Sequence, residues 1–293
     1  MLYKKTKNGV KEGFSRRLFI IMNYVMLTLI SVVMLIPYFK AIAESLSSKV
    51  FVESGSVYLW PRGLNFNAYL NIFSNKDMLS AFFNSVFITV VGTAINLVMT
   101  STLAYATTRK EFKWKGFVLK MILVSMIISV PMMPNYLYIR SIGLDNTLWA
   151  VIIPGAISSY NFYVMRTFFL SIPETLIEAA RIDGCREWRI LTQVVLPVSI
   201  PSFVTVGLFY GVGHWNALQG PLIYLRDMST LQMKVYSMLT NSGVDALENV
   251  NMIAASQSTR MAAIIVTTLP IIMAYPFLQK YFVKGATLGS VKE

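Results

Sequence analysis

The sequence predicts an all-α polytopic membrane protein with six transmembrane helices and both termini in the cytoplasm. Three observations support this fold class. Hydrophobic residues make up 55% of the 293 residues and charged residues only 14%, whereas soluble domains carry about 25% charged residues. Six uncharged apolar stretches are long enough to cross a bilayer, which takes about 20 residues in a helix. Lysine and arginine are concentrated in alternate connections between these stretches.

The six predicted spans are residues 18–39, 78–108, 121–139, 146–165, 190–225 and 261–279. The first is longer than the apolar region of a cleaved signal peptide, about 7–15 residues, and no A-x-A-like site follows it, so we expect a retained helix. Prolines in the third, fourth and sixth spans are Pro131, Pro134, Pro154, Pro270 and Pro276. Because membrane helices tolerate proline, we interpret these residues as kinks rather than loops.

Basic residues set the orientation of the chain. Eighteen of the 26 lysines and arginines lie in residues 1–17, 109–120, 166–189 and 280–293. The positive-inside rule places these segments in the cytoplasm. We therefore expect one membrane domain at residues 18–283, with a basic cytoplasmic tail at 1–17, a second tail at 284–293 and an outer, interface-lying segment at 40–77. The net charge of +12 reflects this topology and predicts no nucleic-acid partner.

The spans exclude several function classes. They contain no Asp, Glu, Lys or Arg, the residues that ion-coupled carriers usually place inside the membrane. The chain has no GxxxxGK[ST], HExxH or GxSxG motif and no TVGYG filter. Cys185 is the only cysteine and His214 the only histidine, so we expect no disulfide within the chain, no metal site and no catalytic residue. Energy for uphill transport would have to come from a partner.

One cytoplasmic segment differs from the rest of the chain because it is rich in charges. The stretch "SIPETLIEAARIDG" predicts a short helix with Pro173 in its first turn and Gly184 as a left-handed cap. After the turn, "REWRILTQVV" predicts a second helix that leads to Pro197. A short helix, a glycine turn and a second helix would project from the membrane. The alternative is that Glu178 and Arg181 simply pair on a solvated helix, worth about 0.2–0.5 kcal/mol.

The spacing within this segment resembles a known signature. Glu178, Ala179 and Ala180 are followed by Gly184, Val194, Leu196 and Pro197 at the spacing EAA-x3-G-x9-I-x-LP. The signature belongs to the membrane permease subunits of binding-protein-dependent ABC importers, and Val194 in place of Ile is the single departure. The six spans, the basic N-terminus and "NSVFITVVGTAINLVMTSTLAYATTR" are similar to the carbohydrate-importer branch. The greatest similarity is to the second permease of the maltose-transporter type, among permeases for oligo- and polysaccharide-derived sugars.

This resemblance implies a function and a set of partners. Residues 171–197 would be the coupling segment, which seats in a groove of a partner ATPase. The implied ATPase-coupling residues are Glu178, Ala179, Ala180, Asp183, Gly184, Leu196 and Pro197. A dimer of ABC ATPases would bind ATP and magnesium, and this chain would bind no cofactor. A second homologous permease, an extracytoplasmic solute-binding protein and a carbohydrate, in particular an oligosaccharide, would complete a multi-pass assembly of the bacterial plasma membrane.

Polar and aromatic residues near the spans are candidates for the substrate pathway. A polar stripe of Thr89, Thr93, Asn96 and Thr100 follows helical spacing, although helix packing is the alternative. Rings that could stack on a sugar adjoin amides that could bind its hydroxyls. The candidate residues are Asn96, Asn135, Tyr160, Asn161, Trp215 and Asn216, with interface anchoring as the alternative for Trp215.

The outer loop at 219–260 has two possible roles. In the family it meets the solute-binding protein, and a cap over the helix bundle is the alternative. The leading hypothesis for the chain is one permease subunit of an ABC importer that forms half of the translocation pathway. The alternatives from other classes are a self-contained secondary carrier or channel, and a membrane-embedded enzyme for which no catalytic constellation is present.

Overall fold

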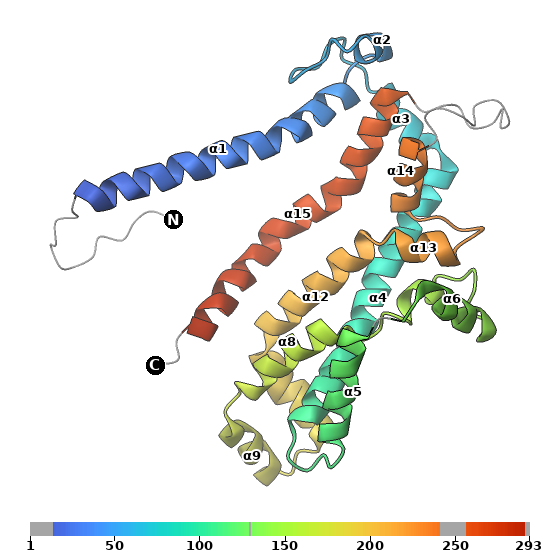
Figure 1. Ribbon diagram of the computed structural model, residues 1–293. Coiled ribbons are helices and arrows are strands. Elements are labelled where there is room, and N and C mark those ends of the chain that lie inside the picture. Colours follow the sequence, from blue (N-terminus) through green and yellow to red (C-terminus); the bar gives the residue numbers. More distant parts are fainter. Residues whose placement is uncertain (1–13, 129, 241–255, 291–293) are drawn as a thin grey trace. The chain divides into compact units, whose positions relative to one another are not determined.

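The computed structural model describes residues 14–128, 130–240 and 256–290 (Figure 1). Within these residues the chain forms helices, and its only β feature is an isolated bridge between Ser47 and Leu64. Parts of three predicted segments lie outside the described residues: 1–13 of the basic tail, 241–255 of the outer loop and 291–293 of the C-terminal tail. The chain divides into two compact units, with boundaries at residues 69/70, 255/256 and 265/266, which are described separately.

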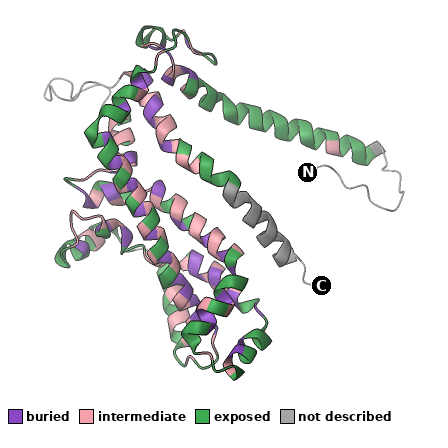
Figure 2. Cartoon of the chain, turned by 180° about the vertical axis from the view of Figure 1, so that it is seen from behind, coloured by how far each residue is buried: buried purple, intermediate pink, exposed green. Residues whose placement is uncertain are grey.

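The first unit contains a long apolar helix and a small folded end. Helices α1 (Phe14–Ser45) and α2 (Lys49–Glu53) belong to it, and α3 (Asn67–Ser74) begins in it. Figure 2 shows α1 exposed along most of its length, which is an apolar surface suited to lipid. At the end of α1, Ala43 packs with Val52 and Val57. The hydroxyl of Ser47 accepts a hydrogen bond from the Arg62 backbone N–H at 2.9 Å and fixes the returning loop.

The second unit is built around the long helix α4 (Lys76–Thr108). The Asn75 side chain caps its start by accepting hydrogen bonds from the backbone N–H groups of Asp77 and Met78. Buried residues recur every three or four positions along one face, which is the helical period. They include Met78, Ala81, Ser85, Ile88, Gly92, Asn96 and Thr100.

Helices α5 (Lys115–Ile127), α8 (Ser159–Leu170) and α12 (Ile200–Trp215) pack with α4. Their shared core contains Phe162, Met165, Phe169 and Val206, which are at most 1% exposed. The unit also includes the helices α6 (Met132–Ser141), α7 (Trp149–Ile152), α9 (Glu174–Ile182), α10 (Glu187–Ile190), the π-helix η1 (Leu191–Val195), α11 (Leu196–Val198), α13 (Gln219–Tyr224) and α14 (Leu231–Thr240). Helix α15 (Gln257–Ser290) begins in the first unit and continues in the second.

Three helices of the described chain are long and apolar enough to cross a membrane, at residues 15–45, 76–108 and 257–276. Residues 187–198 and 200–215 form a fourth candidate that is bent by 87°. The all-helical class is therefore confirmed, while six spans and cytoplasmic termini stay predictions.

The interpretation of every proline as a kink is wrong for the third and fourth predicted spans. Helix α5 ends at Ile127 and α6 begins after Pro131, while Pro154 lies in the turn between α7 and α8. Proline lacks the N–H that would continue the helical bonding, and here the chain leaves the helix. Pro270 and Pro276, by contrast, lie inside the continuous α15, where the prediction of kinks without a loop is compatible with the structure.

Candidate functional site

The charged segment folds as the predicted helix, turn and helix. Helix α9 starts after Pro173, whose backbone has φ −57° and ψ 129°. It ends in a Schellman motif: the Gly184 N–H donates to the Arg181 carbonyl, and the Cys185 N–H donates to the Ala180 carbonyl, both at 3.0 Å. Gly184 has φ +76°, which confirms the predicted left-handed cap.

The second helix contains a wide turn and a sharp bend. Helix α10 begins at Glu187 and runs into η1, in which π-type hydrogen bonding replaces the α-helical pattern. Such π segments are frequent at functional sites. Residues 187–198 and 200–215 meet at 87°, with Ser199 at the bend. The segment is thus connected directly to the membrane helix α12.

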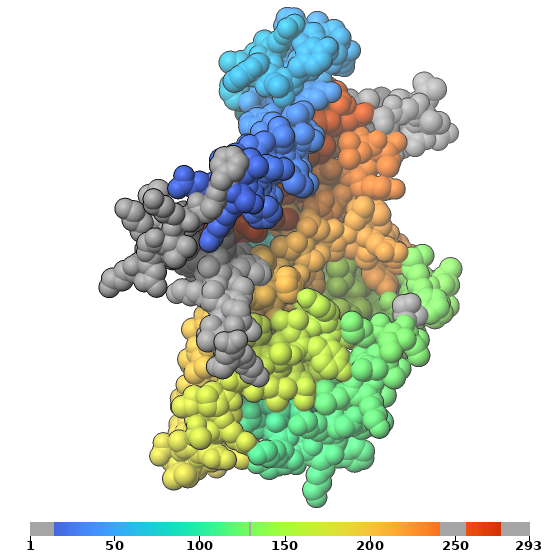
Figure 3. All heavy atoms as spheres, turned by 60° about the vertical axis from the view of Figure 1, so that its left-hand side comes forward, coloured from blue at the N-terminus to red at the C-terminus, as the bar shows by residue number. Residues whose placement is uncertain are grey.

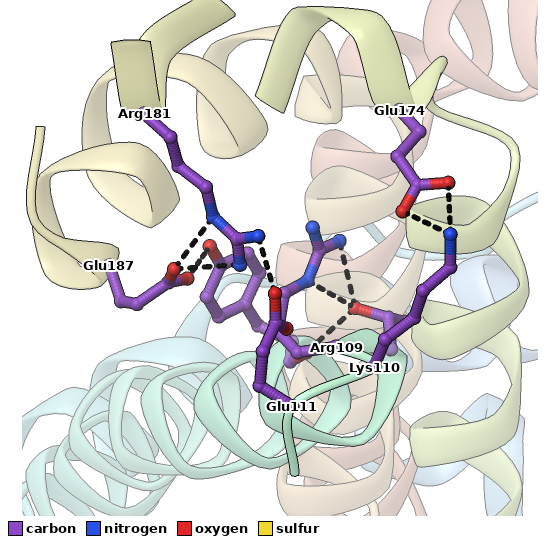
Figure 4. Close-up of polar contacts among 8 residues, drawn as sticks. Arg109, Lys110, Glu111, Glu174, Arg181 and Glu187 are labelled. Carbon is purple, nitrogen blue, oxygen red and sulfur yellow. Dashed lines mark hydrogen bonds and ion pairs between the residues drawn. The ribbon is translucent and has the colours of Figure 1, made fainter. Parts of the chain in front are cut away.

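A cluster of ionic contacts fastens α9 to the C-terminal end of α4 (Figure 4). The Arg181 guanidinium donates hydrogen bonds to one carboxylate oxygen of Glu187 from Nε at 3.1 Å and from Nη2 at 2.9 Å. Its Nη1 donates to Oε1 of Glu111, in the connection that follows α4. The Tyr105 hydroxyl, from the last turns of α4, donates to the other oxygen of Glu187 at 2.5 Å. We call Tyr105, Glu111, Arg181 and Glu187 the anchor cluster.

A second ion pair lies beside the anchor cluster. Nζ of Lys110 is 2.8 Å from both carboxylate oxygens of Glu174, at the start of α9. The Arg109 guanidinium stacks over the Tyr105 ring at 4.7 Å from its centroid. The short connection after α4 therefore contacts both ends of α9. Figure 3 shows the connection (green) and α9–α10 (yellow) as neighbouring parts of one surface.

These contacts shift the pKa values of the exposed acids and bases. The hydrogen bond from Arg181 lowers the pKa of Glu111 from 4.5 to about 2. The hydrogen bond between Lys110 and Glu174 lowers the pKa of the Glu174 carboxyl and raises the pKa of the Lys110 ammonium group. All these groups stay charged near neutral pH. Because exposed pairs are screened by solvent, each pair adds little to the free energy of unfolding. Their consequence for the structure is that they orient α9 relative to the connection after α4.

The predicted coupling residues are divided between two faces of α9. Glu178, Ala179, Asp183 and Gly184 are exposed, whereas Ala180 is only 8% exposed and packs in the core. Leu196 and Pro197 are exposed on α11. The pairing of Glu178 with Arg181 is wrong, because Arg181 binds Glu111 and Glu187 instead. Glu178 has no ion pair within the described part of the chain.

Sequence reasoning missed Tyr105, Lys110 and Glu111 as members of this site. Their partners on α9 and α10 are 64 to 82 positions away in the sequence. The available signal was the basic connection "RKEFKWKG", which contains one acid among its cations and faces the same side of the membrane as the charged segment in the predicted topology. That signal places the two segments on one side without assigning pairs.

The pathway candidates are not brought together in the structure. Asn96, 1% exposed, contacts the His214 ring through Nδ2···Nε2 at 3.0 Å, and Thr100 bonds the Tyr210 hydroxyl at 2.7 Å. These contacts join α4 to α12, so the polar stripe packs helices at these two positions. Trp215, also buried, donates from Nε1 to the Thr267 carbonyl at 2.9 Å.

The other candidates lie in different environments. The Asn135 amide donates to the Tyr224 hydroxyl at 3.1 Å. Asn161 is buried at the start of α8, where Tyr160 is 58% exposed, and Asn216 is exposed beyond α12. A substrate role for any of the six residues stays a prediction.

An open cavity of about 970 Å³ lies between α4, α12 and the second-unit part of α15. Its lining is largely apolar and includes Val86, Leu97, Phe203, Leu208, Val212 and Ile271. It offers few groups that could bind sugar hydroxyls, which require hydrogen-bond partners. The cavity is therefore suited to hydrocarbon rather than to a carbohydrate.

Comparison with known proteins identifies the family of the chain. The family model described as "Binding-protein-dependent transport system inner membrane component" matches residues 11–287. The chain belongs to this family. The membership confirms the resemblance inferred from the EAA signature and makes the chain a component of a membrane transport system.

Individual relatives of this inner membrane component cover nearly its whole length. Protein LplC of Bacillus subtilis is 36% identical, over 98% of this chain and 98% of its own. The polygalacturonan/rhamnogalacturonan transport system permease protein YtcP of the same organism is 35% identical, over 94% and 99%. The crystal structure of a bacterial ABC transporter involved in the import of the acidic polysaccharide alginate contains a chain with a TM-score of 0.84 and 29% identity, over 93% of this chain and 99% of that one.

Proposed function

We propose that the chain is one permease subunit of an ATP-driven importer of a carbohydrate, in particular an oligosaccharide. The observation that carries this proposal is the α9–Gly184–α10 segment, which is anchored on one face and open on the other. Its open face presents Glu178 and Ala179 beside Ile182, which is 86% exposed. An exposed isoleucine beside a small residue and an unpaired acid suits a groove in a partner protein.

The coupling segment would receive movement from a dimer of ABC ATPases that binds ATP and magnesium. Glu178 would meet a basic group or backbone N–H groups of the ATPase, and Ala179 would allow close approach. Gly184 would hold the turn, and Asp183 would add a second exposed acid. Ala180 would act by packing α9 on its own chain, because its side chain is buried. Leu196 and Pro197 would transmit the movement toward the bend at Ser199.

The carbohydrate assignment draws on two relatives. YtcP is named for the transport of polygalacturonan and rhamnogalacturonan, and the structural relative for the import of alginate. The remaining parts of the assembly follow from the family: a second homologous permease that forms the other half of the pathway, and an extracytoplasmic solute-binding protein that delivers the sugar. The proposed topology has six spans within residues 18–283, cytoplasmic tails at 1–17 and 284–293, and a location in the bacterial plasma membrane.

The deciding experiment is purification from membranes with scoring for a bound ATPase. Wild type is compared with Glu178→Lys, which reverses the open acid, and with Gly184→Pro, which is incompatible with φ +76°. The matched control is Glu53→Lys, which reverses an exposed acid on α2, outside the segment. We expect wild type and the control to retain the ATPase and both segment variants to lose it.

The alternative function predicts a different result. A self-contained carrier or channel would transport solute into liposomes as the purified chain alone, with no ATPase present. Such transport, or ATPase binding that is the same in wild type and in folded Gly184→Pro, would contradict the proposed coupling role of the segment.

A further inference from the structure

Apart from its link through residues 171–173 to α8, helix α9 has one route to α12 and one to α4. The covalent route runs through Gly184 and α10 to α12. The second route joins α9 to the end of α4 through the anchor cluster and through the neighbouring pair of Lys110 and Glu174. Arg181 is the member of the cluster that lies on α9, and one side of its guanidinium faces Glu111 while the other faces Glu187.

Packing beneath the cluster strengthens the second route. Ile177 and Ala180, on the inner face of α9, belong to the same buried core as Ala104 and Tyr105 of α4. Because close-packed interiors transmit strain, a displacement of α9 reaches this end of α4. Farther along, α4 is joined to α12 by the hydrogen bonds of Thr100 and Asn96 already described.

We propose that Arg181 is a positioning residue that ties α9 to α4, so that a movement imposed on α9 is delivered to α4 as well as to α12. This inference rests on the proposed function, in which a partner ATPase moves α9. Arginine suits this role because its planar fork presents N–H groups in fixed directions and can bind two carboxylates at once. A lysine ammonium lacks that fixed geometry and would hold the two acids less firmly.

The test is hydrogen exchange measured by mass spectrometry on the complete transporter, with Mg-ATP and vanadate as the probe. In wild type, trapping nucleotide should change the exchange of two segments, the connection 109–114 and the α10–α12 segment 187–215. Arg181→Gln should reduce the change in 109–114 by about two- to fivefold, the range expected for exposed ion pairs. The change in 187–215 should persist, because the covalent route is intact.

Three further variants separate positioning from general damage. Glu111→Gln should reproduce the loss and should fold, because Glu111 is 60% exposed. The double variant should lose no more than Arg181→Gln alone, because that change already removes the pair between Arg181 and Glu111. Arg181→Lys should restore part of the change. The matched control is Arg189→Gln, an exposed arginine of α10 that has no ion pair within the described part of the chain.

The outcomes distinguish the two proposals. A wild-type chain that binds no ATPase overturns the proposed function and this inference together. A nucleotide-dependent change in 109–114 that is equal in wild type and Arg181→Gln, both with ATPase bound, overturns the inference alone. The inference is also overturned if the double variant reduces the exchange change in 109–114 by the product of the two single reductions. It is likewise overturned if Arg189→Gln reduces that change as much as Arg181→Gln does. Either result would show no specific coupling between Arg181 and Glu111.

Discussion

Replacing Gly92 with alanine tests how closely α4 and α12 pack. A Cβ at residue 92 would lie 2.7 Å from Nε2 of His214 and 3.0 Å from two of its ring carbons. The first distance is shorter than real Cβ contacts and the other two are tighter than most, so the ring has to move. It cannot move freely, because Nε2 is also in hydrogen-bond contact with the Asn96 amide at 3.0 Å. The substitution therefore crowds residue 92 against the His214 ring and weakens the contact between that ring and the Asn96 amide.

The expected cost follows from three effects. Overpacking in a tight interface costs about 1–3 kcal/mol. Weakening a hydrogen bond between membrane helices adds about 0.6 kcal/mol. Alanine offsets part of this loss, because it favours a helix over glycine by about 0.8–1 kcal/mol. We therefore expect Gly92→Ala to lower the free energy of unfolding by about 0.6–2.8 kcal/mol.

The assay is unfolding in mixed detergent micelles, followed by helical circular dichroism. The matched control is Gly213→Ala in α12, where no heavy atom lies within 4 Å of the added Cβ, so the control should be neutral or stabilised. Adding His214→Ala to Gly92→Ala should cost less than the sum of the two single changes, because the clash disappears. A Gly92→Ala protein as stable as wild type, or strictly additive costs, would refute the close packing of Gly92 against His214.

Three other predictions each concern a single residue. Gly184→Ala should cost about 1–2 kcal/mol through its left-handed backbone alone, since its Cβ meets no atom within 4 Å, and Gly184→Asn should cost less in the same unfolding assay. Trp215→Phe should cost about 0.5–1.5 kcal/mol, measured likewise, because it removes the hydrogen bond from the indole N–H to the Thr267 carbonyl. The pKa of Glu111 is lowered in the folded chain, so its contribution to stability is complete above about pH 4.5 and is lost as the pH falls toward 2. Between pH 5 and pH 3, wild type should therefore lose more thermal stability than Glu111→Gln; equal losses would contradict the pairing with Arg181.

The helix, turn and helix of the charged segment were predictable because their signals are local. Pro173 and Gly184 bound a short helix through backbone restrictions that any single sequence displays. The spacing to Leu196 and Pro197 then identified the family, which the family model confirms over residues 11–287. Helix boundaries and caps depend on a few neighbouring residues, so the sequence alone contains the necessary information.

The partners of Arg181 were not predictable in the same way. Helical spacing brings Glu178 within reach of Arg181, but reach alone does not decide between competing acids. Glu111 is 70 positions away, and only the folded chain places it beside the guanidinium.

The broken third and fourth spans have a similar cause. Hydropathy is averaged over a whole stretch and does not reveal a local break in the helix. The break near Pro131 depends on whether neighbouring groups supply hydrogen-bond partners for the backbone groups that proline leaves unbonded.

The faces of α9 also change the interpretation of the EAA signature. A nine-residue helix has to be held by its own chain and still present a surface to another protein. Because Ala179 and Ala180 are adjacent, they point about 100° apart around the helix, and the structure exposes the first while burying the second. A larger residue at 180 would therefore push α9 off its core, whereas a larger residue at 179 would obstruct only the partner. The two alanines of the signature thus have different surroundings, and of the two only Ala179, when enlarged, should weaken binding of the proposed ATPase without loss of the chain's own stability.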